Sequence, residues 1–337
     1  MLTPSGSAPT WLGKYVNRID ARITGRFGDG DTSLDRAMKD ALSGGKRVRA
    51  ILALLWCEAL SNNSETAMPV AVAYELAHAA ALVQDDIVDN SDLRRGTKSI
   101  VSKYGLRSAL LASNMLLAQV PTEISEYGKL DPSGETLKKL FEVLGESYGA
   151  AILGEFLDLE MADKNDVLET EYESMIRLKT GALVGASSAS GAIVGGGIGR
   201  DEIVKAAYRF GEYLGMAYQV RDDLLDVMGD QKALGKPIFS DIRSGKKNVI
   251  VIHTLEECSQ EDKRFLTRLL DRKEPFEESG IDRARSLFVQ HGSIEYAQAF
   301  ASKYVEAARS VLDSVELKDE SRAKLLELSG YLADRSY

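Results

Sequence analysis

The 337-residue sequence contains only two cysteines, Cys57 and Cys258. Two cysteines cannot build a disulfide framework, and these two do not have the spacing of metal ligands. We therefore expect both to be small buried residues in a reducing compartment, the cytoplasm. The sequence also lacks an excess of basic residues, since its net charge is −9. This acidic balance argues against wholesale binding to nucleic acid or to an anionic membrane surface.

The sequence has no stretch that we expect to cross a membrane. The best candidate, residues 181–199, is uncharged but consists mostly of Gly, Ser and Ala, which insert poorly into a bilayer. We expect it to be a helix whose small residues let its neighbours approach closely. The first ten residues have neither the basic start nor the apolar core of a signal peptide. We expect residues 1–10 to form a disordered tail.

Strand-like patterns are nearly absent. Only residues 248–252 (NVIVI) resemble a strand, and the same run could equally open a buried helix. Most other segments between turns have the apolar spacing of helices. The helices expected cover residues 34–42, 47–60, 66–89, 109–126, 135–160, 172–193, 201–227, 261–270, 280–290, 294–315 and 320–333. Since no repeat or low-complexity linker divides the chain, we predict one all-α domain, residues 11–337, of ten or more packed helices.

Two aspartate clusters of identical design occur in this helical pattern, at residues 85–89 (DDIVD) and 222–226 (DDLLD). Residues i and i+4 share one face of a helix, so each cluster projects carboxylates from a single patch. Like charges this close repel, and a bound cation normally compensates them. Carboxylate oxygens suit Mg²⁺, which is readily shared with substrate phosphates. Two solvated acidic patches are the alternative, but the hydrophobic surroundings of both clusters argue against it.

Basic residues complete the predicted site. Residues 44–49 (GGKRVR) form a compact basic loop at a helix start, where glycines allow close approach and Lys and Arg suit an anion. Arg94 and Arg95 follow the first aspartate cluster, and their side chains could each bind a different phosphate group. Further basic sets are Lys179, with Thr180 next to it, and Lys236, Lys246 and Lys247. Together these residues predict a pocket for two polyphosphate groups, one held through metal ions and one by Lys and Arg alone.

Taken together, and in their order along the chain, these motifs resemble those of the trans-isoprenyl (all-E polyprenyl) diphosphate synthases. The resemblance covers about residues 44–247 and rests on GGKRVR at 44–49, His78, DDIVDNSDLRRG at 85–96, KTG at 179–181, YQVRDDLLD at 218–226 and GKPIFSDIRSGKK at 235–247. It implies an all-helical fold around a deep central cavity, three Mg²⁺ ions and usually a homodimer. The implied reaction joins isopentenyl diphosphate head-to-tail to an allylic diphosphate.

The resemblance also implies residue roles. The metal ligands would be Asp85, Asp86, Asp89, Asp222, Asp223 and Asp226. The residues that look like further contacts to the allylic diphosphate are Arg94, Lys179, Thr180, Gln219 and Lys236. Those that look like the metal-free isopentenyl diphosphate site are Lys46, Arg49, His78 and Arg95. The residues expected to take part in catalysis are Asp85, Asp86, Asp89, Arg94, Lys179, Asp222 and Lys236. Lys246 matches a lysine near the lip of the site.

The chain departs from the family pattern at three positions. Ala50 replaces a frequent proline, Gln84 replaces a frequent histidine, and Glu155 stands where a glutamine is common. Glu155 therefore places an extra charge in the central helices. No carboxylate or histidine stands out as a dedicated base, and we hypothesise that the leaving diphosphate accepts the final proton.

Product length is predicted from the helix that leads into Asp85. Ala81, Ala80, Ala77 and Tyr74 precede Asp85 by four, five, eight and eleven residues and are expected to face roughly one side of that helix. Farnesyl synthases of the family commonly carry a bulky aromatic four or five residues upstream, where this chain has alanines. We therefore expect products of twenty carbons or more, geranylgeranyl or geranylfarnesyl diphosphate first, with Tyr74 as a candidate floor of the pocket.

Three other interpretations remain: a farnesyl diphosphate synthase (geranyltranstransferase), a class I terpene cyclase, and a non-catalytic subunit of a heteromeric synthase. A cyclase needs no second diphosphate site, so the basic loop at residues 44–49 argues against it. Non-catalytic subunits typically lose an acidic cluster, and this chain retains both.

Overall fold

The computed structural model describes residues 8–28, 30–61, 63–129, 134–164, 166–229, 238–271 and 278–333. The first helices are α1 (Leu12–Phe27), α2 (Ser33–Leu42), α3 (Val48–Ser61), the 3-10 turn η1 (Ser64–Ala67) and α4 (Met68–Val88). A hairpin of β1 (Leu93–Arg94) and β2 (Thr97–Lys98) leads into α5 (Ile100–Tyr104), α6 (Leu106–Tyr127) and α7 (Glu135–Asp163). Next come α8 (Glu169–Ile176), the π-helical turn η2 (Arg177–Gly181), α9 (Ala182–Ala192), the π-helical turn η3 (Ile193–Gly197) and α10 (Asp201–Met228). The described chain ends with α12 (Ser240–Arg243), α13 (Val249–Glu257), α14 (Gln260–Leu270), α15 (Glu278–Gln290), α16 (Ser293–Asp313) and α17 (Asp319–Ala333).

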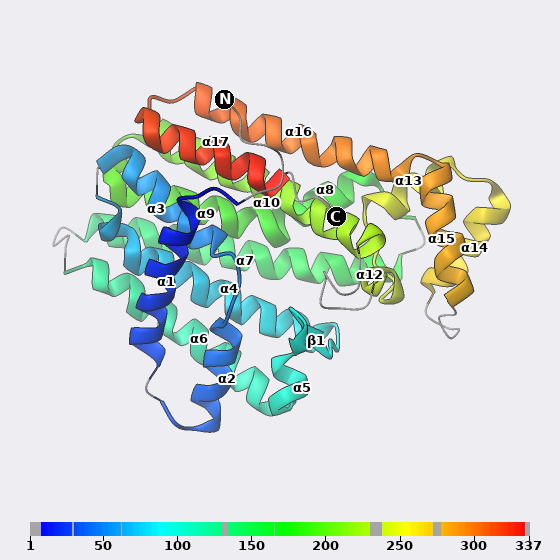
Figure 1. Ribbon diagram of the computed structural model, residues 1–337, viewed down its shortest axis with the longest axis horizontal. Helices are drawn as coiled ribbons and strands as arrows, with labels where there is room; N and C mark the ends of the chain where they lie inside the picture. Colours follow the sequence, from blue (N-terminus) through cyan, green and yellow to red (C-terminus); the bar gives the residue numbers. More distant parts are fainter. Residues whose placement is uncertain are drawn as a thin grey trace.

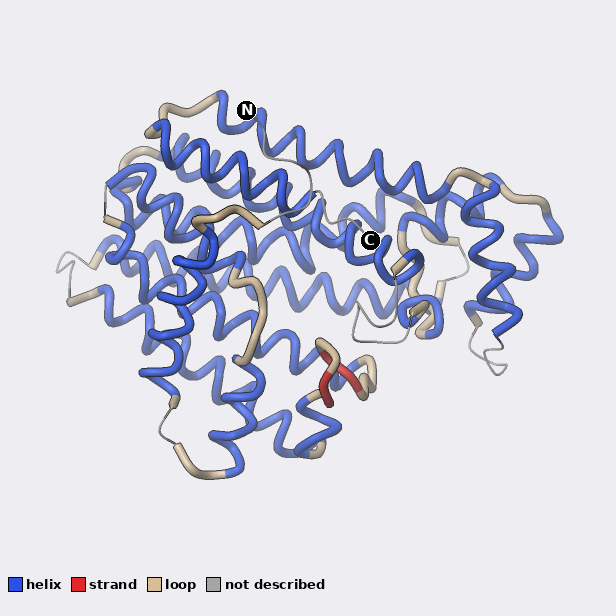
Figure 2. Tube along the Cα trace, in the orientation of Figure 1, coloured by secondary structure: helices blue, strands red, loops and turns tan. Residues whose placement is uncertain are grey.

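The all-α prediction is confirmed (Figures 1 and 2). The expected helices are present with ends shifted by a few residues, and the strand-like run at 248–252 opens α13. The segment predicted as one helix over 172–193 is instead α8, η2 and α9 in succession. Cys57 is buried as expected, whereas Cys258 is only partly buried.

Sequence reasoning missed four elements: α1, the β1–β2 hairpin and the short helices α5 and α12. The signal for α1 was present, because its buried residues Leu12, Tyr15, Ile19 and Ile23 recur at helical spacing. The hairpin strands are too short to show any alternation, and their turn is formed by a non-glycine residue at positive φ followed by a glycine, Arg95 and Gly96.

The core is built around helices that are buried on nearly all sides. α4 packs against α6 and α3, while α9 packs against α10 and α3 (Figure 1). Within the described residues, the segment Ser64–Val88 is long and apolar enough to cross a membrane by length and composition, but 78% of its most apolar window is buried inside the protein. Packing in the core therefore accounts for its apolar character. Both aspartate clusters lie near the carboxyl ends of long helices, α4 and α10.

Glycines allow the central helices to approach closely. A Cβ added at Gly191 of α9 would lie 2.1 Å from the carbonyl oxygen of Ala53 in α3. A Cβ added at Gly154 of α7 would lie 2.2 Å from the backbone nitrogen of Lys179 in η2. The small residues of α9 thus have the packing role that the sequence predicted. The contact at Gly154 also fixes the backbone that carries Lys179.

We predict that Gly191→Ala destabilises the protein by about 1–3 kcal/mol, because the added methyl group overlaps backbone that cannot move away cheaply. The matched control is Gly25→Ala in α1, where an added Cβ meets nothing within 4 Å. That change should leave stability equal or raise it by up to about 1 kcal/mol, since alanine favours helix. Urea unfolding of both variants measures the difference, and equal stabilities would contradict the packing argument.

Candidate active site

An open cavity of about 1380 Å³ lies among α4, α7, η2, α9 and α10, with the basic loop and the segment 240–248 at its rim. Asp85, Asp89, Asp222 and Asp223 line it, so the two aspartate clusters open onto one space. Apolar side chains of α7, α8, α9 and α10, among them Met175, Leu183, Val184 and Leu214, line the same cavity. The site therefore combines a strongly charged region with an apolar wall.

The first cluster lies where α4 ends. Asp89 is the C-cap of α4, and its backbone N–H donates to the carbonyl oxygen of Asp85 over 2.8 Å. The hairpin then turns the chain back so that Arg94 Nε lies 2.8 Å from Asp86 Oδ1, while Arg94 also pairs with Asp85. The i and i+1 carboxylates of the cluster are thus joined by one guanidinium, which offsets their repulsion.

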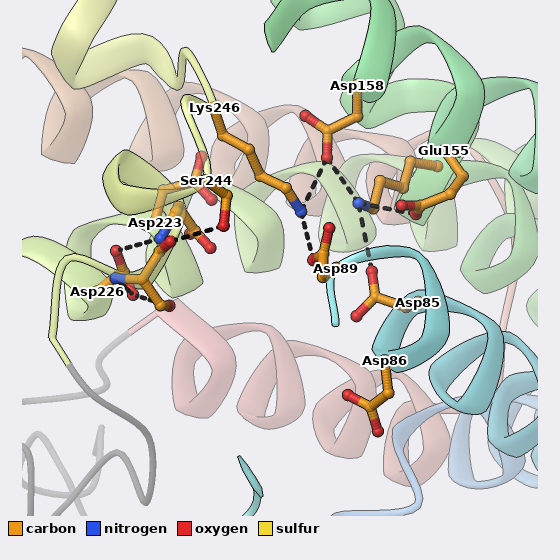
Figure 3. A network of polar contacts seen from close by, with 12 residues as sticks. Asp85, Asp86, Asp89, Glu155, Asp158, Asp223, Asp226, Ser244 and Lys246 are labelled. Atoms are coloured by element: carbon orange, nitrogen blue, oxygen red, sulfur yellow. Dashed lines mark hydrogen bonds and ion pairs between the residues drawn. The ribbon is translucent and has the colours of Figure 1, made fainter. Parts of the chain in front are cut away.

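Lys179 and Lys246 lie between the first cluster and α7. Figure 3 shows Lys246 with its partners Asp89 and Asp158. Lys179 Nζ is 2.7 Å from Asp158 Oδ2, 2.8 Å from Glu155 Oε2 and 3.5 Å from Asp85 Oδ1. Lys246 Nζ is 2.7 Å from Asp89 Oδ2 and 3.4 Å from Asp158 Oδ2. Lysines from distant parts of the chain therefore neutralise carboxylates of α4 and α7 in one network.

Burial and the lysines shift the pKa values of these carboxyl groups in opposite directions. Burial would raise the pKa of Asp85, but Lys179 and Arg94 hold that pKa below its usual value. Burial raises the pKa of Asp86 and of Asp89, with Arg94 and Lys246 opposing it only in part. For Lys179, burial and the neighbouring lysine lower the pKa, yet the surrounding carboxylates raise it well above normal. The ammonium group therefore stays charged within the protein.

The structure also places Glu155. Its Oε2 pairs with Lys179, while its Oε1 is buried without a hydrogen-bond partner, and the side chain lines the cavity. Burial raises its pKa, with Lys179 opposing and Asp85 adding to the rise. The extra charge that the sequence indicated therefore lies in the lysine network, within reach of the first cluster.

The second cluster is organised differently. Asp222 and Asp223 line the cavity. Asp223 accepts hydrogen bonds from the Tyr172 hydroxyl over 2.6 Å and from Gln219 Nε2 over 3.0 Å. Burial raises the pKa of Asp223 to about 7, and the nearby Asp241 adds to the rise. The Thr180 hydroxyl donates to Gln219 Oε1 over 2.7 Å, which connects this chain of hydrogen bonds to η2.

Asp226 does not line the cavity. It accepts hydrogen bonds from the Ser240 hydroxyl over 2.6 Å and from the backbone N–H groups of Ser240 and Asp241, both over 3.1 Å. Its carboxylate therefore organises the start of α12, which carries Asp241 toward the cavity rim. Among the described residues, no three carboxylates converge closely enough to hold a metal ion by themselves.

The basic loop and its neighbours form the other polar region. Arg95 Nη1 donates to the carbonyl oxygen of Ser43 over 2.9 Å, and its guanidinium covers Gly45, where a Cβ would lie 2.9 Å from Arg95 Nη2. Arg49 lines the cavity with its buried Nε unpaired, and burial lowers its pKa. His78 lines the cavity too; burial and then Arg49 hold its pKa well below normal, so it is neutral.

Arg47 has a different role from its basic neighbours. It adopts a positive φ of 54° and is buried. Its Nε lies 2.8 Å from Asp20 Oδ1, its Nη2 2.6 Å from the carbonyl oxygen of Leu42 and its Nη1 3.3 Å from Glu75 Oε2. Arg47 therefore ties α1, α2 and α4 to the loop and shapes it, and it also lines the cavity together with Lys46 and Arg49.

The remaining predicted residues are Lys236 and the four of the chain-length pocket. Lys236 lies in residues 230–237, outside the described residues. Of the four residues expected in the chain-length pocket, Ala81 lines the cavity, whereas Tyr74, Ala77 and Ala80 are buried and do not line it.

Sequence reasoning missed Asp158 and Tyr172. The signal for Asp158 was its position three residues after Glu155, which puts both on one face of α7.

Comparison with known proteins assigns the family. The model of the polyprenyl synthetase family matches residues 31–287. The chain belongs to this family. It is 37% identical over 292 residues to a geranylgeranyl diphosphate synthase of Sulfolobus acidocaldarius, covering 87% of this chain and 86% of the relative. It is 35% identical over 296 residues to a geranylfarnesyl diphosphate synthase of Aeropyrum pernix, covering 87% of this chain and 91% of the relative.

The fold agrees with this assignment. The crystal structure of geranylgeranyl pyrophosphate synthetase from Pyrococcus horikoshii superposes with a TM-score of 0.86 at 33% identity, covering 96% of this chain and 97% of that one. The predicted family and the all-α isoprenoid synthase fold are therefore confirmed, and the protein is a prenyltransferase of the polyprenyl synthase type.

The raised pKa of Asp223 predicts a pH-dependent stability of the metal-free protein. The pKa of Asp223 is about 7 in the folded protein, against an ordinary value of 3.8. Between these two pH values, its carboxyl group is protonated in the folded protein but ionised in the unfolded chain. Its contribution to stability is thus lost as pH rises from about 4 to about 7. Relative to wild type, Asp223→Asn should become progressively more stable over this range, by on the order of 2–4 kcal/mol.

Urea unfolding in the presence of a chelator, in steps from about pH 4 to pH 8, measures this difference. Asp201→Asn serves as the control, because Asp201 is an exposed carboxylate on the same helix. If the stability difference between Asp223→Asn and wild type did not change with pH, Asp223 would not have the raised pKa.

Proposed function

We propose that the protein condenses isopentenyl diphosphate with an allylic diphosphate to give a trans-polyprenyl diphosphate of twenty carbons or more. The observation that carries this proposal is that two unlike anion-binding regions open onto one partly apolar cavity. One is built from Asp85, Asp222 and the lysines Lys179 and Lys246, and the other from Lys46, Arg49 and Arg95. A metal-dependent and a metal-free diphosphate site on the same cavity are what head-to-tail condensation needs.

The carboxylate region fits Mg²⁺. Asp85, Asp89 and Asp222 present hard oxygen ligands to the cavity, and the diphosphate of a substrate would supply the remaining ligands. We propose these three, with Asp86, Asp223 and Asp226 supporting them, as the residues that hold about three Mg²⁺ ions. When bound, Mg²⁺ neutralises charge that develops on the leaving diphosphate. The unpaired Oε1 of Glu155 lies on the same side of the cavity.

The chain's own residues have three tasks in this reaction. Lys179, Lys246 and Arg94 would exchange their carboxylate partners for diphosphate oxygens, with Thr180 and Gln219 beside them and Lys236 as a further contact. The apolar wall of Met175, Leu183 and Leu214 would keep water from the allylic carbocation. Since the pKa of His78 is lowered, a neutral imidazole can donate a single hydrogen bond to the isopentenyl diphosphate without adding charge. We propose the leaving diphosphate as the acceptor of the final proton.

We further propose a cytoplasmic homodimer made of one domain per chain, residues 11–337. The support for a dimer is an exposed apolar surface on two neighbouring helices, which comprises Leu106, Leu110, Leu111 and Met115 of α6 and Phe141, Ile152, Leu153 and Phe156 of α7. An apolar surface of this kind on adjacent helices is typical of a subunit interface. Ile152 and Phe156 also line the cavity, so a second copy seated there would help to close it.

The metal assignment predicts large losses of rate. Asp85→Ala and Asp222→Ala should each lower turnover by on the order of 10³-fold, because each removes a ligand of the ions that neutralise the leaving group. Asp92→Ala is the matched control, since Asp92 is an exposed carboxylate at the cavity rim, outside the cluster. The assay supplies Mg²⁺, isopentenyl diphosphate and each allylic primer, and identifies the products. Near-normal turnover of both cluster variants would refute the metal assignment.

We propose that Tyr74 closes the product pocket below the part of α4 that lines the cavity. Tyr74, His78, Ala81 and Asp85 follow one another at steps of three or four residues, so they share one face of α4. Ala81, His78 and Asp85 line the cavity, and the fully buried Tyr74 lies one turn beyond, with its hydroxyl 2.9 Å from Ser190 Oγ of α9. Ala80 precedes Ala81 by about 100° of helical rotation, so it points away from the middle of this face.

Product length should follow this geometry. Ala81→Phe should shorten the main product toward fifteen carbons, because the ring would fill the cavity beside the growing chain. Tyr74→Ala should lengthen it, whereas Tyr74→Phe, which keeps the ring, should leave it unchanged. Chromatography of dephosphorylated products tests all three variants. A wild-type enzyme that stops at farnesyl diphosphate would contradict the proposed length and leave the proposed reaction class standing.

A further inference from the structure

The last helix of the chain returns to the basic loop near its beginning. The centroid of the Tyr331 ring lies 5.2 Å from Lys46 Nζ, within the range of a cation–π interaction. Lys46 and Leu332, the residue after Tyr331, both line the cavity. The end of α17 therefore forms part of the metal-free anion region, although no motif in the sequence connected residues 319–333 with the site.

The position of Tyr331 is set by a well-anchored helix. Leu325, Leu328 and Leu332 of α17 are buried in the core. Arg309 of α16 donates from Nε to Ser329 Oγ over 3.2 Å, and Lys324 Nζ lies 2.8 Å from Glu58 Oε1 of α3. In Figure 1, α17 lies between α16 and the central helices. The ring thus projects from a rigid element on the side of the helix that faces the basic loop.

Lys46 carries its charge on a flexible four-carbon chain. It follows two glycines at positive φ, Gly44 and Gly45. Holding such a side chain in one place has an entropic cost, which an aromatic surface reduces before the ligand arrives.

We propose that Tyr331 is a positioning residue for Lys46, which holds the ammonium group in place for the metal-free diphosphate of isopentenyl diphosphate. A ring beside an ammonium group occupies one side of it and leaves N–H donors for phosphate oxygens. The proposal rests on the proposed function, because it takes isopentenyl diphosphate as the ligand of the basic loop.

The test compares Tyr331→Leu with Tyr331→Phe. Leucine removes the ring but keeps an apolar side chain, whereas phenylalanine keeps the ring and loses only the hydroxyl. We expect Tyr331→Leu to raise KM for isopentenyl diphosphate roughly two- to fivefold, with a smaller change in kcat and in KM for the allylic primer. Tyr331→Phe should match wild type. Equilibrium dialysis with labelled isopentenyl diphosphate measures the same loss of affinity without turnover.

A double-mutant cycle with Lys46→Ala isolates the pair. In the Lys46→Ala background, Tyr331→Leu should have no further effect on binding of isopentenyl diphosphate. A full additional loss in that background would overturn the proposal, as would equal increases in both KM values or a Tyr331→Phe variant that behaves like Tyr331→Leu. Wild type that binds isopentenyl diphosphate but transfers it to no primer would refute the proposed function alone, and wild type that does not bind it would refute both.

Discussion

Packing many carboxylates into one partly buried space is the constraint on which the site depends. Asp85, Asp89, Asp158 and Glu155 surround the ammonium groups of Lys179 and Lys246 within hydrogen-bonding or ion-pairing distance. In a medium of low polarity, like charges at such separations are tolerated only when opposite charges lie between them. Lys179 and Lys246 provide those charges. A bound diphosphate with its metal ions would replace one balanced arrangement with another, and the lysines are already in place for it.

The backbone that carries these lysines is fixed by close packing. Lys179 lies in a π-helical turn, and the main chain there touches α7 at Gly154, where any side chain would collide with it. A π-helical turn shifts the register of a helix and so redirects the side chains within it. The position of Lys179 near both Glu155 and Asp85 therefore follows from the contact of α7 with η2. The charge network depends on glycine packing as much as on the charges themselves.

Local pattern was enough to predict most of the helices, both aspartate clusters and the basic loop, because helical spacing and charge are local properties of a sequence. It was not enough for roles that depend on partners far along the chain. Asp226 organises the start of α12 through Ser240 and Asp241, a contact across a segment that carries no helical signal. No sequence motif connected Tyr172 with the second cluster, and only the structure placed its hydroxyl on Asp223. Ala80 was grouped with Ala81, although adjacent residues of a helix point in different directions.

The two clusters have the same sequence pattern, yet only part of their arrangement is shared. In each, the second aspartate accepts hydrogen bonds from side chains nearby: Asp86 from Arg94, and Asp223 from Tyr172 and Gln219. The third aspartate differs, because Asp89 faces the cavity and pairs with Lys246, whereas Asp226 turns toward the backbone of the next helix. The first aspartates, Asp85 and Asp222, both face the cavity. The motif therefore fixes where the first carboxylate points, and the surrounding fold decides what the other two do.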